Sequence, residues 1–150
     1  MKRKPFYATI GVISEGTLLS DDLLDAFSGE LRSLMGRLHI GREDRKRYVK
    51  LLHDCKMAVD ALHRVVNDLE EALNELAPPY AYFGANEGDG ACFGFFPCRG
   101  DTDDLPKIKA GDEFPRALWG EEVLIVNDHG NVDCGRIDAR GRFHAYWSCV

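Results

Sequence analysis

The fold depends on residues 48–79, YVKLLHDCKMAVDALHRVVNDLEEALNELAPP, in which apolar side chains recur at alternating steps of four and three. The stripe consists of Tyr48, Leu52, Cys55, Val59, Leu62, Val66, Leu69, Leu73 and Leu76. This spacing places every member on one face of an α-helix, and the prolines that follow, Pro78 and Pro79, end it. The sequence therefore predicts one long, continuous helix with a single apolar face.

A shorter helix is predicted before it. Ser20 supplies a hydroxyl that can accept a hydrogen bond from a free backbone N–H, and Asp21 and Asp22 suit the positive end of a helix. The apolar side chains that follow at helical spacing are Leu24, Phe27, Leu31, Leu34 and Leu38, and Gly41 is the predicted stop. Residues 20–77 are therefore predicted to form a helical hairpin.

The two predicted helices differ in length. At 1.5 Å per residue the first spans about 27 Å and the second about 50 Å, so a hairpin leaves part of the longer stripe uncovered. A sheet of the same chain is one covering, and another protein or a second copy of the chain is the alternative. A homodimer through the stripe of the long helix is thus one expectation.

The remaining segments are typical of β-strands. Residues 6–13, FYATIGVI, predict a first strand, and residues 79–150 predict a β-meander. The strands of the meander are YAYFG and ACFGFFP around the turn-rich ANEGDG, followed by EVLIVN, NVDCGRID and RFHAYWSCV. The prediction is a single α+β domain over residues 1–150, with a helical hairpin (two α-helices) packed on a mostly antiparallel β-sheet of about five or six strands.

Composition narrows the class of protein. The chain has 150 residues, of which 45% are hydrophobic and 29% charged, as in ordinary globular proteins. A formal net charge of -6 argues against a general nucleic-acid binder and permits a partner with a basic surface. No apolar run is long enough to span a bilayer, and the five cysteines form no C-x-x-C pair, so we expect a cytoplasmic protein with reduced thiols.

The glycine-rich hairpin loop is the first candidate binding site. Its candidate oxygen donors, together with those of the connection that follows, are Asn86, Glu87, Asp89, Asp101, Asp103 and Asp104. Oxygen donors suit a hard cation such as Ca²⁺, but the spacing does not match an EF-hand loop, and acids in β-turns commonly serve the turn itself. We predict no bound metal and no cofactor. Two glycines of this hairpin, Gly84 and Gly94, predict close packing against a neighbour or, as the alternative, a shallow pocket floored by backbone.

The turn NDHGN at residues 127–131 is the second candidate. Asp128 and His129 could act as an acid and base pair, with His144 nearby if the meander pairs as predicted. The same residue types are what a hairpin turn requires. No catalytic residue is assigned, and the chain lacks the common phosphate-binding, zinc-hydrolase and serine-hydrolase motifs.

Charge is distributed unevenly along the predicted long helix. Its start carries Arg42, Arg45, Lys46, Arg47 and Lys50, which could contact phosphates or form a solvated helix face. Glu70, Glu71 and Glu75 lie near its other end. Opposite ends of two antiparallel copies would attract each other.

With these residues in view, the chain resembles a family of small uncharacterised proteins of bacterial plasmids, integrative elements and phages. The resemblance rests on YAYFGANEGDGACFGFFP (80–97) with its Phe-Gly-Phe-x-Pro end, and on VLIVNDHGNV (123–132). A YATI segment near the start, a Ser-Asp-Asp-Leu-Leu helix entrance and a final strand with Trp also match. The resemblance implies no catalytic residues, but it implies a context like that of anti-CRISPR and anti-restriction proteins.

These observations lead to one functional hypothesis and two alternatives. The hypothesis is a non-enzymatic accessory protein of a mobile element or phage that binds another protein, such as a host CRISPR or restriction complex. One alternative is a small metal-dependent hydrolase that uses Glu87, Asp89, Asp128 and His129. The other is a nucleic-acid-binding module that uses the basic start of the long helix.

Overall fold

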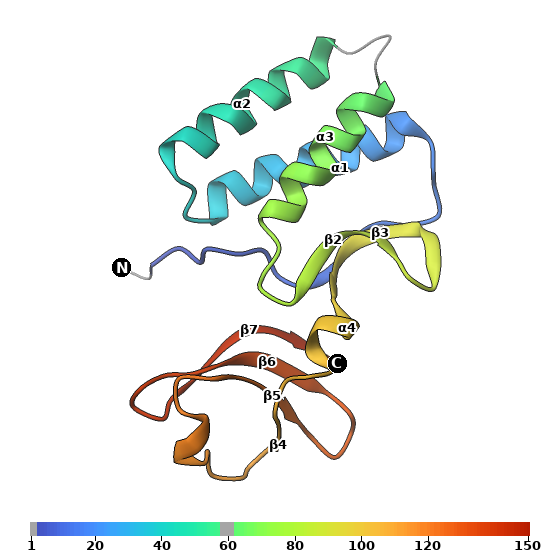
Figure 1. The fold of residues 1–150 in the computed structure, drawn as a ribbon. Helices are drawn as coiled ribbons and strands as arrows, with labels where there is room; N and C mark the ends of the chain where they lie inside the picture. The colour runs from blue at the N-terminus through green and yellow to red at the C-terminus, as the bar shows by residue number, and fades with distance from the viewer. Residues whose placement is uncertain (1–2, 58–61) are drawn as a thin grey trace. The chain divides into compact units, whose positions relative to one another are not determined.

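A computed structural model describes residues 3–57 and 62–150 (Figure 1). The chain divides into two compact units. The first takes the residues up to Ala77 together with Tyr82–Phe96, and the second takes Pro78–Ala81 and Pro97–Val150. The fold is α+β, and each unit contains a sheet of its own.

Three helices and a three-stranded antiparallel sheet make up the first unit (Figure 1). The helices are α1 (Ser20–Arg37), α2 (Arg42–Met57) and α3 (Leu62–Glu75). The strands are β1 (Gly11–Ser14), β2 (Ala81–Asn86) and β3 (Asp89–Pro97), in the order β1-β3-β2. The first strand is therefore shorter and later than the predicted 6–13, and it pairs with β3.

The prediction of one continuous helix after Gly41 is wrong. Arg47 Nη2 lies 2.6 Å from Glu75 Oε2, and the Tyr48 hydroxyl donates to the same oxygen at 2.9 Å. In a continuous helix, residues separated by 28 positions would lie about 42 Å apart. The chain must therefore turn back between α2 and α3, which run antiparallel. One member of the predicted stripe, Val59, lies outside the described residues.

The apolar stripe is buried within the first unit. Its described members are buried, apart from Leu62, which is half-buried. They pack in one core with apolar side chains of α1 and the hairpin, and Phe27 of α1 makes edge contacts with the rings of Phe83 and Phe93 at 5.1 and 5.4 Å. Of the two coverings considered for the stripe, a sheet of the same chain is the one observed for these residues, together with α1. A homodimer through the stripe loses its physical basis.

The second unit contains a four-stranded sheet in the order β4-β5-β6-β7. Its strands are β4 (Lys107–Lys109), β5 (Glu122–Val126), β6 (Val132–Ile137) and β7 (Phe143–Cys149), with a short helix α4 (Arg99–Thr102) and a 3-10 turn η1 (Arg116–Leu118). β4 pairs parallel to β5, and the other pairs are antiparallel. The predicted single sheet of five or six strands is therefore wrong. Strands that follow one another in sequence need not pair, and here β3 pairs with β1 and β2 while β4 begins a second sheet.

A polar cluster holds the segment Pro78–Ala81 to the second unit. The hydroxyls of Tyr80 and Tyr146 both donate to the Glu122 carboxylate, the latter at 2.9 Å, and the Trp147 indole N–H donates to the Pro79 carbonyl at 2.9 Å. The bond to the carboxylate, with burial, raises the pKa of Tyr80 to about 12, and burial, with the bond to the same carboxylate, raises the pKa of Tyr146 to about 12. Tyr80 has a φ of 62°, a conformation uncommon for a non-glycine residue.

Within the described residues, no helix has both the length and the apolar composition that crossing a membrane requires.

Glu75→Ala is expected to lower the free energy of unfolding by about 1–2 kcal/mol, because the buried Tyr48 side chain loses its acceptor and Arg47 loses a partner. The hydrogen bond from Arg47 lowers the pKa of Glu75 below its ordinary 4.5. The contribution of the Glu75 carboxylate to the stability of the folded state is therefore complete above pH 4.5. It is lost as the pH falls through the lower pKa that Glu75 has in the folded state. Urea unfolding of wild type and variant over this pH range measures both effects. Glu71→Ala, one helical turn away, is the control.

Gly94→Ala is expected to destabilise the first unit by about 1–3 kcal/mol, because a Cβ there would lie 2.3 Å from the Gly11 carbonyl oxygen of β1. Gly90 lies in the same strand with nothing within 4 Å of its Cβ position, so Gly90→Ala is the matched control. Thermal unfolding of the two variants distinguishes them. Equal stability would contradict the close β1–β3 approach.

Candidate functional site

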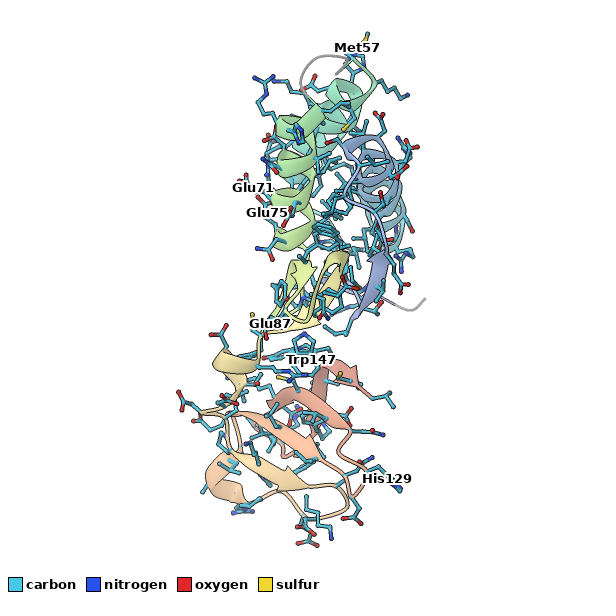
Figure 2. The ribbon with its side chains drawn as sticks, turned by 90° about the vertical axis from the view of Figure 1, so that its right-hand side faces the viewer. Met57, Glu71, Glu75, Glu87, His129 and Trp147 are labelled. Carbon is cyan, nitrogen blue, oxygen red and sulfur yellow. The ribbon has the colours of Figure 1, made fainter. Side chains whose placement is uncertain are left out.

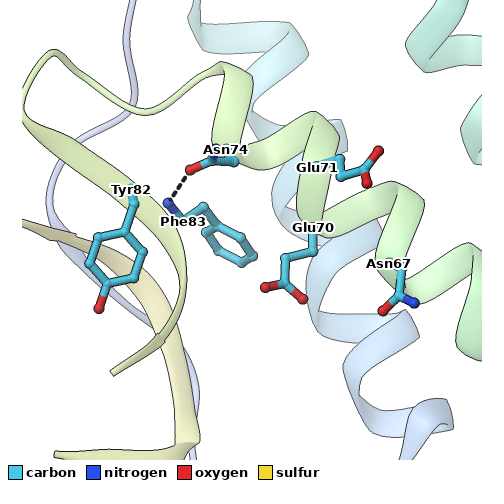
Figure 3. A pocket seen from close by; sticks show the side chains of 6 residues that line it. All are labelled: Asn67, Glu70, Glu71, Asn74, Tyr82 and Phe83. Atoms are coloured by element: carbon cyan, nitrogen blue, oxygen red, sulfur yellow. Dashed lines mark hydrogen bonds between the residues drawn. The ribbon is translucent and has the colours of Figure 1, made fainter. Parts of the chain in front are cut away.

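The surface of the first unit carries a pocket of about 500 Å³ between α3 and β2 (Figure 3). We call it the acidic pocket, and its lining residues are Asn67, Glu70, Glu71, Asn74, Tyr82 and Phe83. The four residues from α3 follow helical spacing and therefore share one face of the helix, which lies beside the apolar stripe. The pocket thus combines two carboxylates, two amides and an aromatic ring.

The edge strand beside the pocket is capped by local bonds. Asn74 Oδ1 accepts from the Phe83 backbone N–H at 2.9 Å (Figure 3), and the Tyr82 hydroxyl donates to the Ala85 carbonyl at 3.0 Å. β2 lies at the edge of its sheet, where free backbone groups could pair with a foreign strand. The Phe83 N–H and the Ala85 carbonyl are engaged and are therefore not free to pair with a strand of a partner.

Glu70 is the central acidic group of the pocket. It is half-buried, and no described residue forms a hydrogen bond or ion pair with it. Burial raises its pKa, and the neighbouring Glu71 carboxylate adds to the effect. A Cβ at Gly84 would lie 3.3 Å from Glu70 Oε1, so the missing side chain of Gly84 leaves room for this carboxylate. The predicted close packing at Gly84 is therefore confirmed, with Glu70 as the neighbour.

This set of groups suits a cation. Carboxylates give their strongest hydrogen bonds to ammonium and guanidinium groups. The face of an aromatic ring such as that of Tyr82 also attracts such groups. A lysine or arginine side chain combines that charge with an apolar stem that can lie along Phe83.

α2 presents a basic face. Its lining residues are Arg42, Arg45, Lys46, Val49, Lys50 and His53, around a hollow of about 640 Å³. Val49 is 55% exposed in the middle of this face. Three of the predicted basic residues have partners. Arg45 donates to the Met35 carbonyl at 2.8 Å, Lys46 pairs with Glu43 at 3.3 Å, and Arg47 pairs with Glu75.

A groove of about 260 Å³ joins the two faces. We call it the interhelical groove, and it is lined by Arg47, Lys50, Leu51, Asp54, Asp68, Glu71, Ala72 and Glu75. It shares Lys50 with the basic face and Glu71 with the acidic pocket. Figure 2 shows Glu71 and Glu75 on the same side of α3. The surface therefore changes continuously from positive to negative across α2 and α3.

The predicted hairpin-loop residues mostly serve their own turn. Asn86 Oδ1 accepts from the Gly88 N–H at 2.8 Å, and Asp89 Oδ1 accepts from the Ala91 N–H at 3.0 Å. Glu87 is exposed. The remaining predicted donors, Asp101, Asp103 and Asp104, lie in and just after α4 of the second unit and are exposed. These contacts favour the turn interpretation of the loop.

The second predicted site is also organised as a turn. Asn127 Oδ1 accepts from the backbone N–H groups of His129 and Asn131, each at 2.9 Å. Asp128 forms an exposed ion pair with Lys109 at 3.2 Å.

His144, expected to approach this turn, instead contacts Asp138 Oδ2 at 2.9 Å. Backbone and side-chain bonds, that of the Arg142 N–H first, lower the pKa of Asp138. Among the described residues, no three His, Cys, Asp or Glu side chains are arranged to hold a metal ion.

The sequence allows for a shallow pocket at Gly84 but does not connect it with Glu70 and Glu71, which it indicates only as helix charges. A signal was present, because Asn67, Glu70, Glu71 and Asn74 form a polar stripe at helical spacing. The contribution of Tyr82 and Phe83 could not be found this way, because it depends on which helix packs beside β2.

Comparison with known protein families, with curated proteins and with solved structures finds no significant match to this chain. The resemblance described from the sequence therefore stays a prediction. The chemistry of the acidic pocket carries the functional proposal.

Glu70→Gln is expected to raise the free energy of unfolding near neutral pH by up to about 0.5 kcal/mol, because the amide removes a half-buried charge. The raised pKa of Glu70 means that the folded state holds this proton more tightly than the unfolded state. The free energy of unfolding of the wild type therefore rises relative to that of the variant as the pH falls toward 4.5, the ordinary pKa of a glutamate side chain. Thermal unfolding at several pH values tests this, with the exposed Glu87→Gln as control.

Proposed function

We propose that the protein acts without catalysis by binding another protein, and that the acidic pocket accepts a lysine or arginine side chain of that partner. The observation that carries this proposal is the half-buried Glu70 carboxylate, which has no counter-charge among the described residues and lies beside Glu71. A basic side chain would supply that charge and the missing hydrogen bonds. The Phe83 N–H and the Ala85 carbonyl of β2 already form hydrogen bonds, which favours a partner that binds through its side chains.

The resemblance extends this proposal to an accessory protein of a mobile genetic element or phage. Host CRISPR and restriction complexes bind nucleic acid, and surfaces that do so are rich in lysine and arginine. An acidic pocket on a chain of net charge -6 is complementary to such a surface. A host defence complex is therefore the partner class that we propose.

The two alternatives have weaker support. The hydrolase would use Glu87 and Asp89 of the first unit with Asp128 and His129 of the second, and the described contacts engage these segments in their own turns. The nucleic-acid module would use the basic face of α2, beside which the carboxylates of α3 would repel phosphates.

Acetyl-arginine amide is the probe for the pocket. We expect it to shift the NMR signals of the Asn67 side-chain amide and the Tyr82 ring, whereas the uncharged isostere acetyl-citrulline amide should not. Glu70→Gln with Glu71→Gln should abolish the shifts, and Glu87→Gln should leave them unchanged. Equal shifts from both probes, or none from either, would overturn the proposed recognition of a basic side chain.

The partner class is tested separately with purified CRISPR and restriction complexes. We expect the wild-type chain to comigrate with one of them in native gels and to act stoichiometrically, and the Glu70→Gln, Glu71→Gln double variant to lose both properties. Turnover of a substrate by the wild-type chain would favour the hydrolase instead. Absence of comigration with every complex would exclude this partner class.

A further inference from the structure

The two helices that flank the interhelical groove carry opposite charges. α2 has six Lys or Arg against three Asp or Glu, a net charge of +3. α3 has one Arg against four Asp or Glu, a net charge of -3. Part of this charge has no partner, since neither Lys50 nor Glu71 forms an ion pair with any described residue. On the groove itself, Arg47 and Lys50 lie on the α2 side and Asp68, Glu71 and Glu75 lie on the α3 side, with Asp54 as the one acid of α2. Apart from Asp54, the groove is therefore complementary to a copy of itself in which the two helices are exchanged.

The antiparallel packing fixes which residues lie at the same height. Arg47 lies beside Glu75, and both helices rise 1.5 Å per residue in opposite directions. Leu51 is therefore level with Glu71, and Asp54 is level with Asp68. Lys50 lies within about 1.5 Å of the height of Glu71.

Two copies that meet through this surface can be related by a two-fold axis across the helices or along them. An axis across the helices sets α2 against α2 and α3 against α3, so like charges face each other. An axis along the helices sets α2 of each copy against α3 of the other at the same height, so opposite charges face each other. Coulombic energy selects the second arrangement.

We propose that a second copy of this chain docks on the interhelical groove, with Lys50 of each copy facing Glu71 of the other. The partly buried Leu51 lines the groove between these charged side chains. Asp54 and Asp68 carry like charges at one end of the groove, so the contact centres on the end near Arg47 and Glu75. The proposal rests on the proposed function in one respect, the attraction of a basic side chain to Glu71.

The contact is mostly polar, and this sets its salt dependence. Exposed ion pairs weaken as salt shortens the screening length from about 10 Å at 0.1 M to about 3 Å at 1 M. The dimer should therefore form at low ionic strength and dissociate at about 1 M NaCl. A contact dominated by apolar burial would strengthen or persist there instead.

Light scattering after size exclusion distinguishes a monomer of 16.8 kDa from a dimer. We expect wild type to be dimeric at low salt, and Lys50→Glu and Glu71→Lys each to be monomeric. An equimolar mixture of the two variants should recover a dimer, because the two substituted side chains then face each other with opposite charges while the natural pair completes the second contact. Lys107→Glu and Glu87→Lys, exposed in other elements and with the same charge changes, are the controls and should remain dimeric.

A wild-type monomer at low salt would overturn the proposal, as would a dimer that survives both charge reversals or a mixture that stays monomeric. Circular dichroism of each variant verifies that a monomer is still folded. Binding of acetyl-arginine amide to the wild type separates the two proposals. If acetyl-arginine amide binds while no dimer forms, only the proposed dimer is wrong. If the probe does not bind and no dimer forms, the proposed function is wrong as well.

Discussion

The carboxylate of Glu75 accepts from both Arg47 and Tyr48, and through them it holds α2 antiparallel to α3. This arrangement turns a row of apolar side chains that would otherwise run the length of one rod into two shorter rows that face α1 together. It also brings the basic side of α2 next to the acidic side of α3. The core and the charged surface of the first unit therefore have a common origin.

Local patterns predicted the elements better than their arrangement. The helical spacing in residues 20–38 and 48–76 and the strand patterns after Pro79 match observed helices and strands, because these patterns reflect which face of each element is buried. The reversal between α2 and α3 was missed, since the apolar spacing continues in phase across it and no proline or glycine marks it. The division into two sheets was missed because strand pairing is decided by contacts distant in sequence, such as Gly11 with Phe95.

Candidate sites were predicted where unusual residues cluster, and those clusters turned out to shape loops. Asn86, Asp89 and Asn127 use their side-chain oxygens on neighbouring backbone N–H groups, which is a common role of such residues in turns. The acidic pocket instead draws on residues common on any helix surface. What distinguishes Glu70 is its partial burial near Gly84, and a sequence does not reveal which strand packs beside a helix.

The polar cluster around Glu122 has a consequence for biosynthesis. The segment Pro78–Ala81 belongs to the second unit, although it lies between two portions of the first. Neither unit is a contiguous stretch of chain, so neither can finish folding while the ribosome has made only its early part. Phe27 can form its ring contacts only after Phe83 and Phe93 have been synthesised. The hydrogen bonds of Tyr80 and Tyr146 to Glu122 form later still. During translation the helices would therefore expose apolar rings, a period in which chaperones that hold nascent chains would have most to bind.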